Sequence, residues 1–220
     1  TLSDAKSWAA LTYYGDVTVR NCNFTGNGAG FYSYYNKSFD AMNSKFDSNV
    51  SYGMAYHSNG KYYGLKDNRW DWYLHDGPGR ITNCSISNNT SYGLYLYDVT
   101  SNTIQISNTP IQGNGAAGLY ANWSQLEFNP QTMRDSWQLK GNGSHIYGGY
   151  GKYTFLGLDL SDAKSYGVAT WYSEVSVKEC NFARNGYNGA SHGCVNVRDR
   201  AAIARLFDLA RVGDKVIVYN

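Results

Sequence analysis

Residues 2–28, LSDAKSWAALTYYGDVTVRNCNFTGNG, return near the other end of the chain as LSDAKSYGVATWYSEVSVKECNFARNG at residues 160–186. The two stretches align without a gap, so the chain contains an internal repeat with an offset of 158 residues. Self-similarity at a fixed period indicates an architecture of stacked units, and the unit must be shorter than this offset.

A shorter period runs inside the long one. A turn asparagine, followed by small residues and an apolar run, recurs at Asn27, Asn49, Asn89, Asn114, Asn142 and Asn185. Lys6 and Lys164 take the equivalent place in two further units, and a degenerate unit near Asn68 fills the widest gap. Short β runs spaced by about 20 to 28 residues, with no helical pattern, predict an all-β fold that stacks coils about 4.8 Å apart. We expect residues 1–190 to form a right-handed parallel β-helix of eight or nine coils.

Alternation along each predicted strand indicates which side chains face outward. In YGLYLYD, Leu94 and Leu96 point inward, whereas Tyr95 and Tyr97 point outward. The same reading predicts an outward column of Tyr13, Tyr34, His57, Tyr97, Asn122 and Trp171. Such a column can bind a glycan through Tyr34, Tyr97 and Trp171, because the axial C–H face of a sugar packs on aromatic rings. It can equally be a stacked ladder that only stabilises the sheet.

Composition limits the classes of partner. The net charge is +2 and only 16% of residues are charged, without a basic stripe, so we expect no nucleic-acid partner. No apolar run reaches 18 residues, which argues against a membrane-spanning helix. The chain begins with Thr1 inside an already patterned segment, so we interpret it as a processed form or a fragment. A surface rich in Asn, Ser, Thr and Tyr is typical of extracellular, glycan-facing β proteins.

The cysteines favour a structural role for three of the four. Cys22, Cys84 and Cys180 occupy the same place in their coils, and whole coils separate them, so we expect buried free thiols and no disulfide among them. No C-x-x-C pair or Cys/His cluster exists, so neither a metal nor another cofactor is expected.

The pattern changes after Asn185. SHGCVNV reads as a strand, RDRAAIARLFDLA at residues 198–210 has helical spacing, and KVIVY at 215–219 reads as a second strand. We therefore expect a tail domain over residues 191–220, which either has its own activity or caps the open end of the solenoid.

This tail resembles the end of the L,D-transpeptidase (YkuD-type) catalytic domain, whose motif is Ser/Thr-His-Gly-Cys-apolar-Asn/Arg. Ser191, His192, Gly193, Cys194 and Asn196 match it in order. The resemblance implies that Cys194 is a nucleophile acylated by a peptidoglycan stem peptide, with backbone N–H groups near Gly193 holding the oxyanion. His192 and Ser191 would line the catalytic site, and Asn196 would contact substrate. The resemblance also implies a bacterial cell-envelope or extracellular location.

That family uses a second, upstream histidine as its base, and His145 is the nearest upstream candidate here. The family's β-sandwich has no counterpart in residues 1–190. The motif can therefore catalyse acyl transfer only if this chain supplies the second histidine.

The body of the chain resembles right-handed parallel β-helix proteins of the pectate-lyase type, which include enzymes and binding proteins. Lyases of this type use outward charged residues or histidine, and DNRWDWYLHDG is the richest such stretch. It supplies Asp67, Arg69, Asp71, His75 and Asp76. Two functions thus remain open: a cysteine acyltransferase on a β-helix scaffold, and a β-helix that binds or cleaves a polysaccharide.

Overall fold

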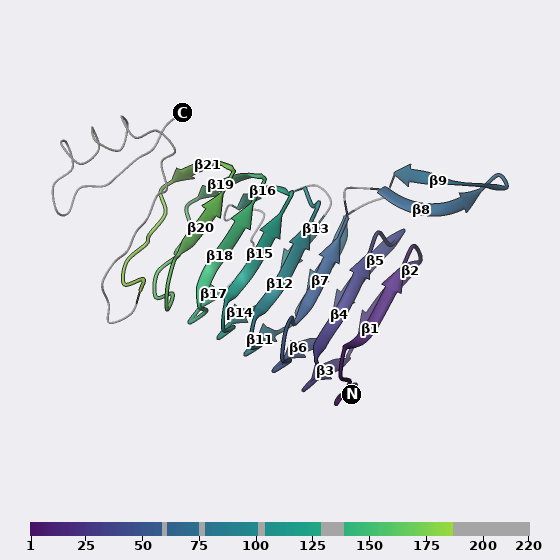
Figure 1. The fold of residues 1–220 in the computed structure, drawn as a ribbon, viewed down its shortest axis with the longest axis horizontal. Coiled ribbons are helices and arrows are strands. Elements are labelled where there is room, and N and C mark those ends of the chain that lie inside the picture. Colours follow the sequence, from purple (N-terminus) through teal and green to yellow (C-terminus); the bar gives the residue numbers. More distant parts are fainter. Residues whose placement is uncertain (59–60, 75–77, 101–103, 129–138, 187–220) are drawn as a thin grey trace.

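The computed structural model describes residues 1–58, 61–74, 78–100, 104–128 and 139–186, and every regular element within them is a β-strand (Figure 1). The largest sheet contains seven parallel strands, one from each successive coil. In their order across the sheet they are β1 (Trp8–Tyr13), β4 (Ala29–Tyr34), β7 (Met54–His57), β12 (Tyr92–Tyr97), β15 (Ala117–Asn122), β18 (Ser144–Gly149) and β20 (Val168–Trp171). This arrangement is the predicted parallel β-helix.

The other sides of the coils carry shorter sheets, which are also parallel. The second side comprises β2 (Asp16–Arg20), β5 (Ser38–Met42), β10 (Gly79–Thr82) and β13 (Ile104–Ser107), and a separate sheet of β16 (Gln125–Phe128), β19 (Lys152–Leu156) and β21 (Glu174–Lys178). The third side comprises β3 (Asn23–Thr25) with β6 (Lys45–Asp47), and β11 (Ile86–Ser87) with β14 (Ile111–Gln112) and β17 (Leu139–Lys140).

Inward side chains stack from coil to coil and form the core. Register aligns Met54, Leu94, Leu119 and Ile146 on neighbouring strands, and all four are fully buried. Each such side chain contributes about 1.5–3 kcal/mol through burial. The alternation of apolar and polar residues therefore holds the coils together through one continuous column.

A ladder of asparagine side chains fixes one corner of the coils. The amide Nδ2 of Asn27 donates to Oδ1 of Asn49 at 3.2 Å, and the pattern continues at 2.9–3.0 Å through Asn89, Asn114 and Asn142. Each Oδ1 also accepts the backbone N–H of the preceding asparagine. The predicted turn asparagines are thus structural, because they satisfy backbone groups that the coil leaves buried.

The prediction of a degenerate coil near Asn68 is wrong. Asn49 bonds directly to Asn89, so no coil lies between them. The intervening residues form an antiparallel hairpin of β8 (Lys61–Lys66) and β9 (Arg69–Leu74), which projects from the solenoid in Figure 1. Its turn residues Asp67 and Asn68 both have positive φ, as a two-residue hairpin turn requires. Seven strands in the main sheet therefore give about six full turns instead of eight or nine coils.

The predicted equivalence of Lys6 and Lys164 to the asparagines is off by one residue. The backbone N–H of Ala5 donates to Asn27 Oδ1 at 3.0 Å, and that of Ala163 donates to Asn185 Oδ1 at 2.8 Å. Ala5 and Ala163 thus occupy the ladder position. The described residues contain no helix that is long and apolar enough to cross a membrane. The predicted tail at 191–220 lies outside them, so the division into domains at residue 190 stays a prediction.

Candidate functional site

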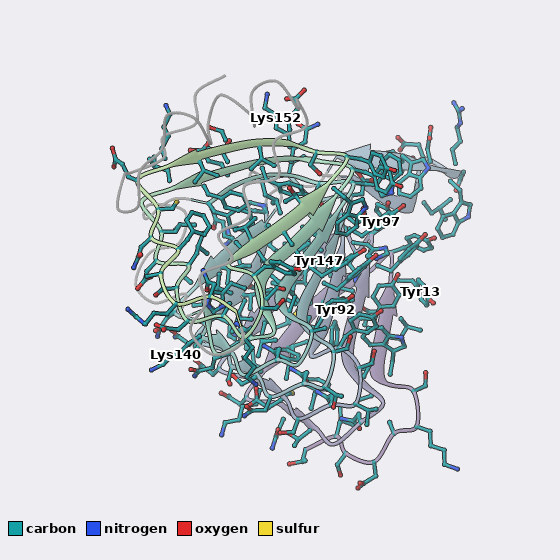
Figure 2. The ribbon with its side chains drawn as sticks, turned by 60° about the vertical axis from the view of Figure 1, so that its left-hand side comes forward. Tyr13, Tyr92, Tyr97, Lys140, Tyr147 and Lys152 are labelled. Carbon is teal, nitrogen blue, oxygen red and sulfur yellow. The ribbon has the colours of Figure 1, made fainter. Side chains whose placement is uncertain are left out.

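Two columns of side chains cover the outer side of the seven-stranded sheet, and we call them the aromatic face. Strand register aligns the first column as Tyr13, Tyr34, His57, Tyr97, Asn122, Gly149 and Trp171. The second column is Leu11, Tyr32, Ala55, Tyr95, Tyr120, Tyr147 and Ala169. The first column is the predicted one with Gly149 added. Figure 2 shows Tyr13, Tyr97 and Tyr147 on the same side of the solenoid.

His57 lies among tyrosine rings in the N-terminal half of the aromatic face. Its imidazole stacks on Tyr97 with ring centroids 4.7 Å apart, and the Tyr32 hydroxyl lies 3.2 Å from its Nδ1. Burial lowers the pKa of His57 to about 4, so the ring is neutral at physiological pH. Burial also raises the pKa of the Tyr95 phenol to about 12. The centre of the face therefore carries no charge.

Many tyrosine rings of this side cover one another. Tyr95 and Tyr120 are stacked with centroids 5.0 Å apart and planes within 13°, and Tyr52 and Tyr92 are stacked at 5.7 Å. Parallel rings at this separation leave no space for a ligand ring between them. These stacks stabilise the sheet and offer a ligand mainly ring edges and hydroxyl groups.

Trp171 is placed differently. A Cβ atom added to Gly149 would lie 2.2–2.5 Å from Cε2, Cζ2 and Nε1 of the Trp171 indole. Three bonded ring atoms at nearly equal distances indicate that the indole lies over the glycine with one face against the backbone. Its other face points away from the sheet, and the ring remains partly exposed. Only glycine at position 149 permits this arrangement, since any side chain would occupy the space of the ring.

A second aromatic stack, which the sequence analysis missed, follows the corner beside the aromatic face. Trp123 stacks on Tyr150 at 4.7 Å, and Tyr150 stacks on Tyr172 at 5.3 Å, with planes within 7° and 16°. All three residues have positive φ, which bulky residues rarely adopt. The signal in the sequence was an aromatic residue directly after five of the seven outward column members, as in Trp171-Tyr172.

The acidic and basic residues of the stretch at 67–77 do not converge on a site among the described residues. Asp67 lies at the turn of the β8–β9 hairpin, Arg69 and Asp71 lie on β9, and all three are exposed. Asp71 Oδ1 accepts the backbone N–H of Trp72 at 2.8 Å. His75 and Asp76 lie outside the described residues. Over that same part of the chain, no group of three or more His, Cys, Asp or Glu side chains could hold a metal ion.

His145 has a structural place in the core. It aligns with Gly118 of the neighbouring strand, is fully buried, and its Nε2 lies 2.6 Å from the Ser161 carbonyl oxygen. Its Nδ1 lies 3.4 Å from Asn142 Nδ2. Burial lowers the pKa of this imidazole. Both ring nitrogens therefore face protein groups, and His145 is not available as the second histidine of an acyl-transfer site.

The cysteine column has the predicted position. The backbone N–H of Cys22 donates to Ser44 Oγ, and that of Cys84 donates to Thr109 Oγ1. Cys22, Cys84 and Cys180 are free thiols; Cys84 is buried and the other two are partly buried. Burial raises the pKa of Cys84 and of Cys180, so neither is an activated thiolate. The tail residues Ser191, His192, Gly193, Cys194 and Asn196 lie outside the described part of the chain.

Charged side chains gather on the neighbouring side of the solenoid. A cavity of about 300 Å³ beside β2 and β5 is lined by Asp16, Lys37, Asp40 and Arg80, among others. One buried oxygen of Asp40 has no hydrogen-bond partner among the described residues. The Lys37 ammonium lies 3.7 Å from Asp16 in an exposed pair. This side of the solenoid therefore carries charged side chains, whereas the two columns of the aromatic face do not.

Comparison with known proteins agrees with the architecture. The family model described as right handed beta helix region matches residues 73–202. No curated protein and no solved structure matches the chain. The match thus covers more than half of the chain and concerns its fold.

Proposed function

The chain belongs to the right-handed β-helix family, and from this premise we propose that it is a carbohydrate-binding protein whose aromatic face holds a polysaccharide. A β-helix hosts many functions, so the proposal depends on the site and not on the fold.

The observation that carries the proposal is the position of Trp171 over Gly149. An indole lying on the sheet surface, with its second face outward, is a flat apolar platform. The axial C–H groups of a pyranose ring pack on such a platform, whereas the stacked rings of Tyr95 and Tyr120 cannot offer one. Tyr147, whose ring centroid lies 4.8 Å from that of Trp171, borders the platform.

Polar groups beside the platform supply hydrogen bonds to sugar hydroxyls. Tyr120 and Tyr147 carry phenol groups within the same cluster of rings, and Asn122 faces Trp171 across Gly149. Phenols both donate and accept hydrogen bonds, so they suit sugar hydroxyl groups of either orientation. The Oδ1 of Asn122 is buried without a hydrogen-bond partner among the described residues, so this side chain adds no exposed acceptor. A mixture of one apolar platform and several neutral polar groups is typical of ligand sites.

The test is depletion of the protein by insoluble polysaccharides, with wild type and two tryptophan variants. Trp171→Ala should weaken binding about tenfold, since a well-stacked ring contributes about 1.4 kcal/mol, which is a factor of ten in affinity. Trp70→Ala is the matched control, because Trp70 is 60% exposed but lies on the β8–β9 hairpin.

Two results would contradict the proposal. One is equal loss of binding in both variants, which would show nonspecific adhesion through exposed indoles. The other is unchanged binding in Trp171→Ala together with a large fall in melting temperature, which would show that the ring only stabilises the sheet.

The motif in the tail supports a second candidate function. We propose that Cys194 performs acyl transfer on peptidoglycan stem peptides in the bacterial cell envelope, on the basis of SHGCVN at residues 191–196. The thiolate would attack the peptide carbonyl, expel an amine, and hold the acyl group as a thioester. His145 is buried beside the asparagine ladder, and its Nε2 faces the Ser161 carbonyl oxygen. It therefore cannot serve as the base for this site.

Mass spectrometry after brief incubation with a carbapenem tests this candidate, since such β-lactams acylate the nucleophile of this enzyme class. A stoichiometric adduct on Cys194 that is absent in Cys194→Ser would support acyl transfer. Modification of Cys194 only after unfolding would make the tail a cap on the solenoid.

A further inference from the structure

We infer that the aromatic face selects an uncharged polysaccharide chain that lies along the solenoid axis and crosses the strands. The inference rests on the proposed carbohydrate-binding function and names the class of ligand. It follows from where the chain places its charges and from the direction of the two outward columns.

Neither outward column contains an acidic or basic side chain apart from His57. Seven consecutive strands thus present fourteen aligned positions without Asp, Glu, Lys or Arg. Asp98, at the corner beside the face, accepts a hydrogen bond from the Tyr35 hydroxyl at 3.1 Å. This carboxylate could only repel a polyanion.

The charges lie on the other sides of the coils. Outward positions of the second side include Asp16, Arg20, Asp40, Arg80 and Lys152. In Figure 2, Lys140 and Lys152 lie away from the labelled tyrosines. The absence of charge is therefore a property of the aromatic face and not of the whole surface.

His57 does not supply a cation on this face. The groups around its imidazole are Tyr32, Tyr34, Tyr35, Tyr95 and Tyr97, and all of them are phenols. An acidic sugar placed there would lose hydration of its carboxylate without gaining a charged partner, and such desolvation is unfavourable. The hydroxyl groups of a neutral sugar can exchange water for phenols at little net cost.

The columns determine the direction of the ligand. They run from β1 to β20, and six steps of about 4.8 Å give a length of roughly 29 Å along the axis. A face of this length fits several consecutive sugar rings, so the ligand is a polymer. The Trp171 platform lies at the end of this track nearest β20.

The experiment compares one polymer with and without charge. Cellulose, mannan and mixed-linkage β-glucan are first tested for binding, and the polymer that binds is then partially oxidised at its primary hydroxyls to carboxylates. We expect oxidation to weaken binding about tenfold or more, because the new carboxylates meet no counter-charge. Trp171→Ala should weaken binding to the neutral polymer in the same assay.

A charge added to the face provides the reverse test. Asn122→Lys places an ammonium beside Trp171 and should restore binding to the oxidised polymer. Added salt should abolish this restored binding, because salt screens the attraction between the ammonium and the carboxylates. Melting temperature and circular dichroism confirm that the variant is folded. Asn122→Gln is the uncharged control, and Asn122→Arg replaces the lysine variant should that variant fail to fold.

The outcomes separate the inference from the proposed function. Equal or tighter binding of the oxidised polymer by wild type, lost in Trp171→Ala, would overturn the selection of neutral chains and leave carbohydrate binding intact. Binding of no polymer in either form would overturn the proposed function itself, and the inference with it.

Discussion

His145 fills the space that a ladder asparagine would occupy at Ala163. In the neighbouring coil the residue aligned with His145 is Gly118, and a Cβ atom there would lie 2.6 Å from Asn142 Nδ2. Gly53 and Gly93 meet the amides of Asn89 and Asn114 in the same way. Asn89, Asn114 and Asn142 therefore each require a glycine beside them. The alanine at 163 has no amide, and the imidazole takes its place.

This pairing predicts strong coupling between two substitutions. Ala163→Asn alone should clash with His145, and His145→Gly alone should leave a cavity, each costing about 2–4 kcal/mol of unfolding free energy. The double variant recreates the glycine–asparagine pair of the other coils and should recover most of that loss. Chemical denaturation of all four proteins gives the coupling energy. Additive losses would show that the two positions are independent.

The asparagine ladder should contribute heavily to stability. Asn89→Ala removes the acceptor of the Asn49 N–H and the donor to the Phe46 carbonyl, both buried. Two unsatisfied backbone groups should lower the unfolding free energy by about 3 kcal/mol or more. Asn43→Gly is the control, because Asn43 is exposed with a φ of 50° that glycine adopts freely. Equal loss of stability in both variants would argue against the ladder.

Stability should fall as the pH drops from about 6.5 towards 4. The pKa of His57 is about 4 in the folded chain and about 6.5 in an unfolded one, so the unfolded state takes up the proton first. His145 acts in the same direction. Denaturation at pH 7 and pH 5 measures the difference, and His57→Gln should reduce it. An unchanged pH dependence in that variant would show that His57 is not buried as described.

Cys84 should resist alkylation in the folded protein. Its side chain is 3% exposed, its thiol donates to the Thr82 carbonyl oxygen, and burial raises its pKa. Iodoacetamide at neutral pH, followed by peptide mass spectrometry, should label Cys84 only after denaturant is added. Rapid labelling without denaturant would mean that the coil opens at this position.

Much of the fold could be predicted from the sequence because its signals are local and repeated. The turn asparagines and the alternation in YGLYLYD determine the coil spacing and the facing of Leu94 and Tyr95. The sequence pattern predicted a coil near Asn68 where the structure has a hairpin at 61–74. The reason is that the hairpin turn, Asp67-Asn68, contains an asparagine, as the coil corners do. Only the direct bond from Asn49 to Asn89 shows that this segment lies outside the ladder.

The candidate site could be predicted only as a column of residues. Register aligned Tyr34, Tyr97 and Trp171, but the pattern could not reveal which ring is covered and which is free. Tyr97 stacks on His57, whereas Trp171 lies over Gly149, which is aligned with Asn122 on the adjacent strand. These differences depend on side-chain torsions and on the space left by Gly149, which no period in the sequence encodes.

The most direct test of the central claim leaves Trp171 in place and changes what lies beneath it. Gly149→Ala adds a Cβ atom into the space of the indole and should lift the ring from the sheet. Gly15→Ala is the control, because its nearest contact would be an ordinary 3.7 Å. We predict that Gly149→Ala stays folded by circular dichroism yet binds the polysaccharide about tenfold more weakly, as Trp171→Ala does, while Gly15→Ala binds like wild type. Wild-type affinity in a folded Gly149→Ala variant would contradict the account.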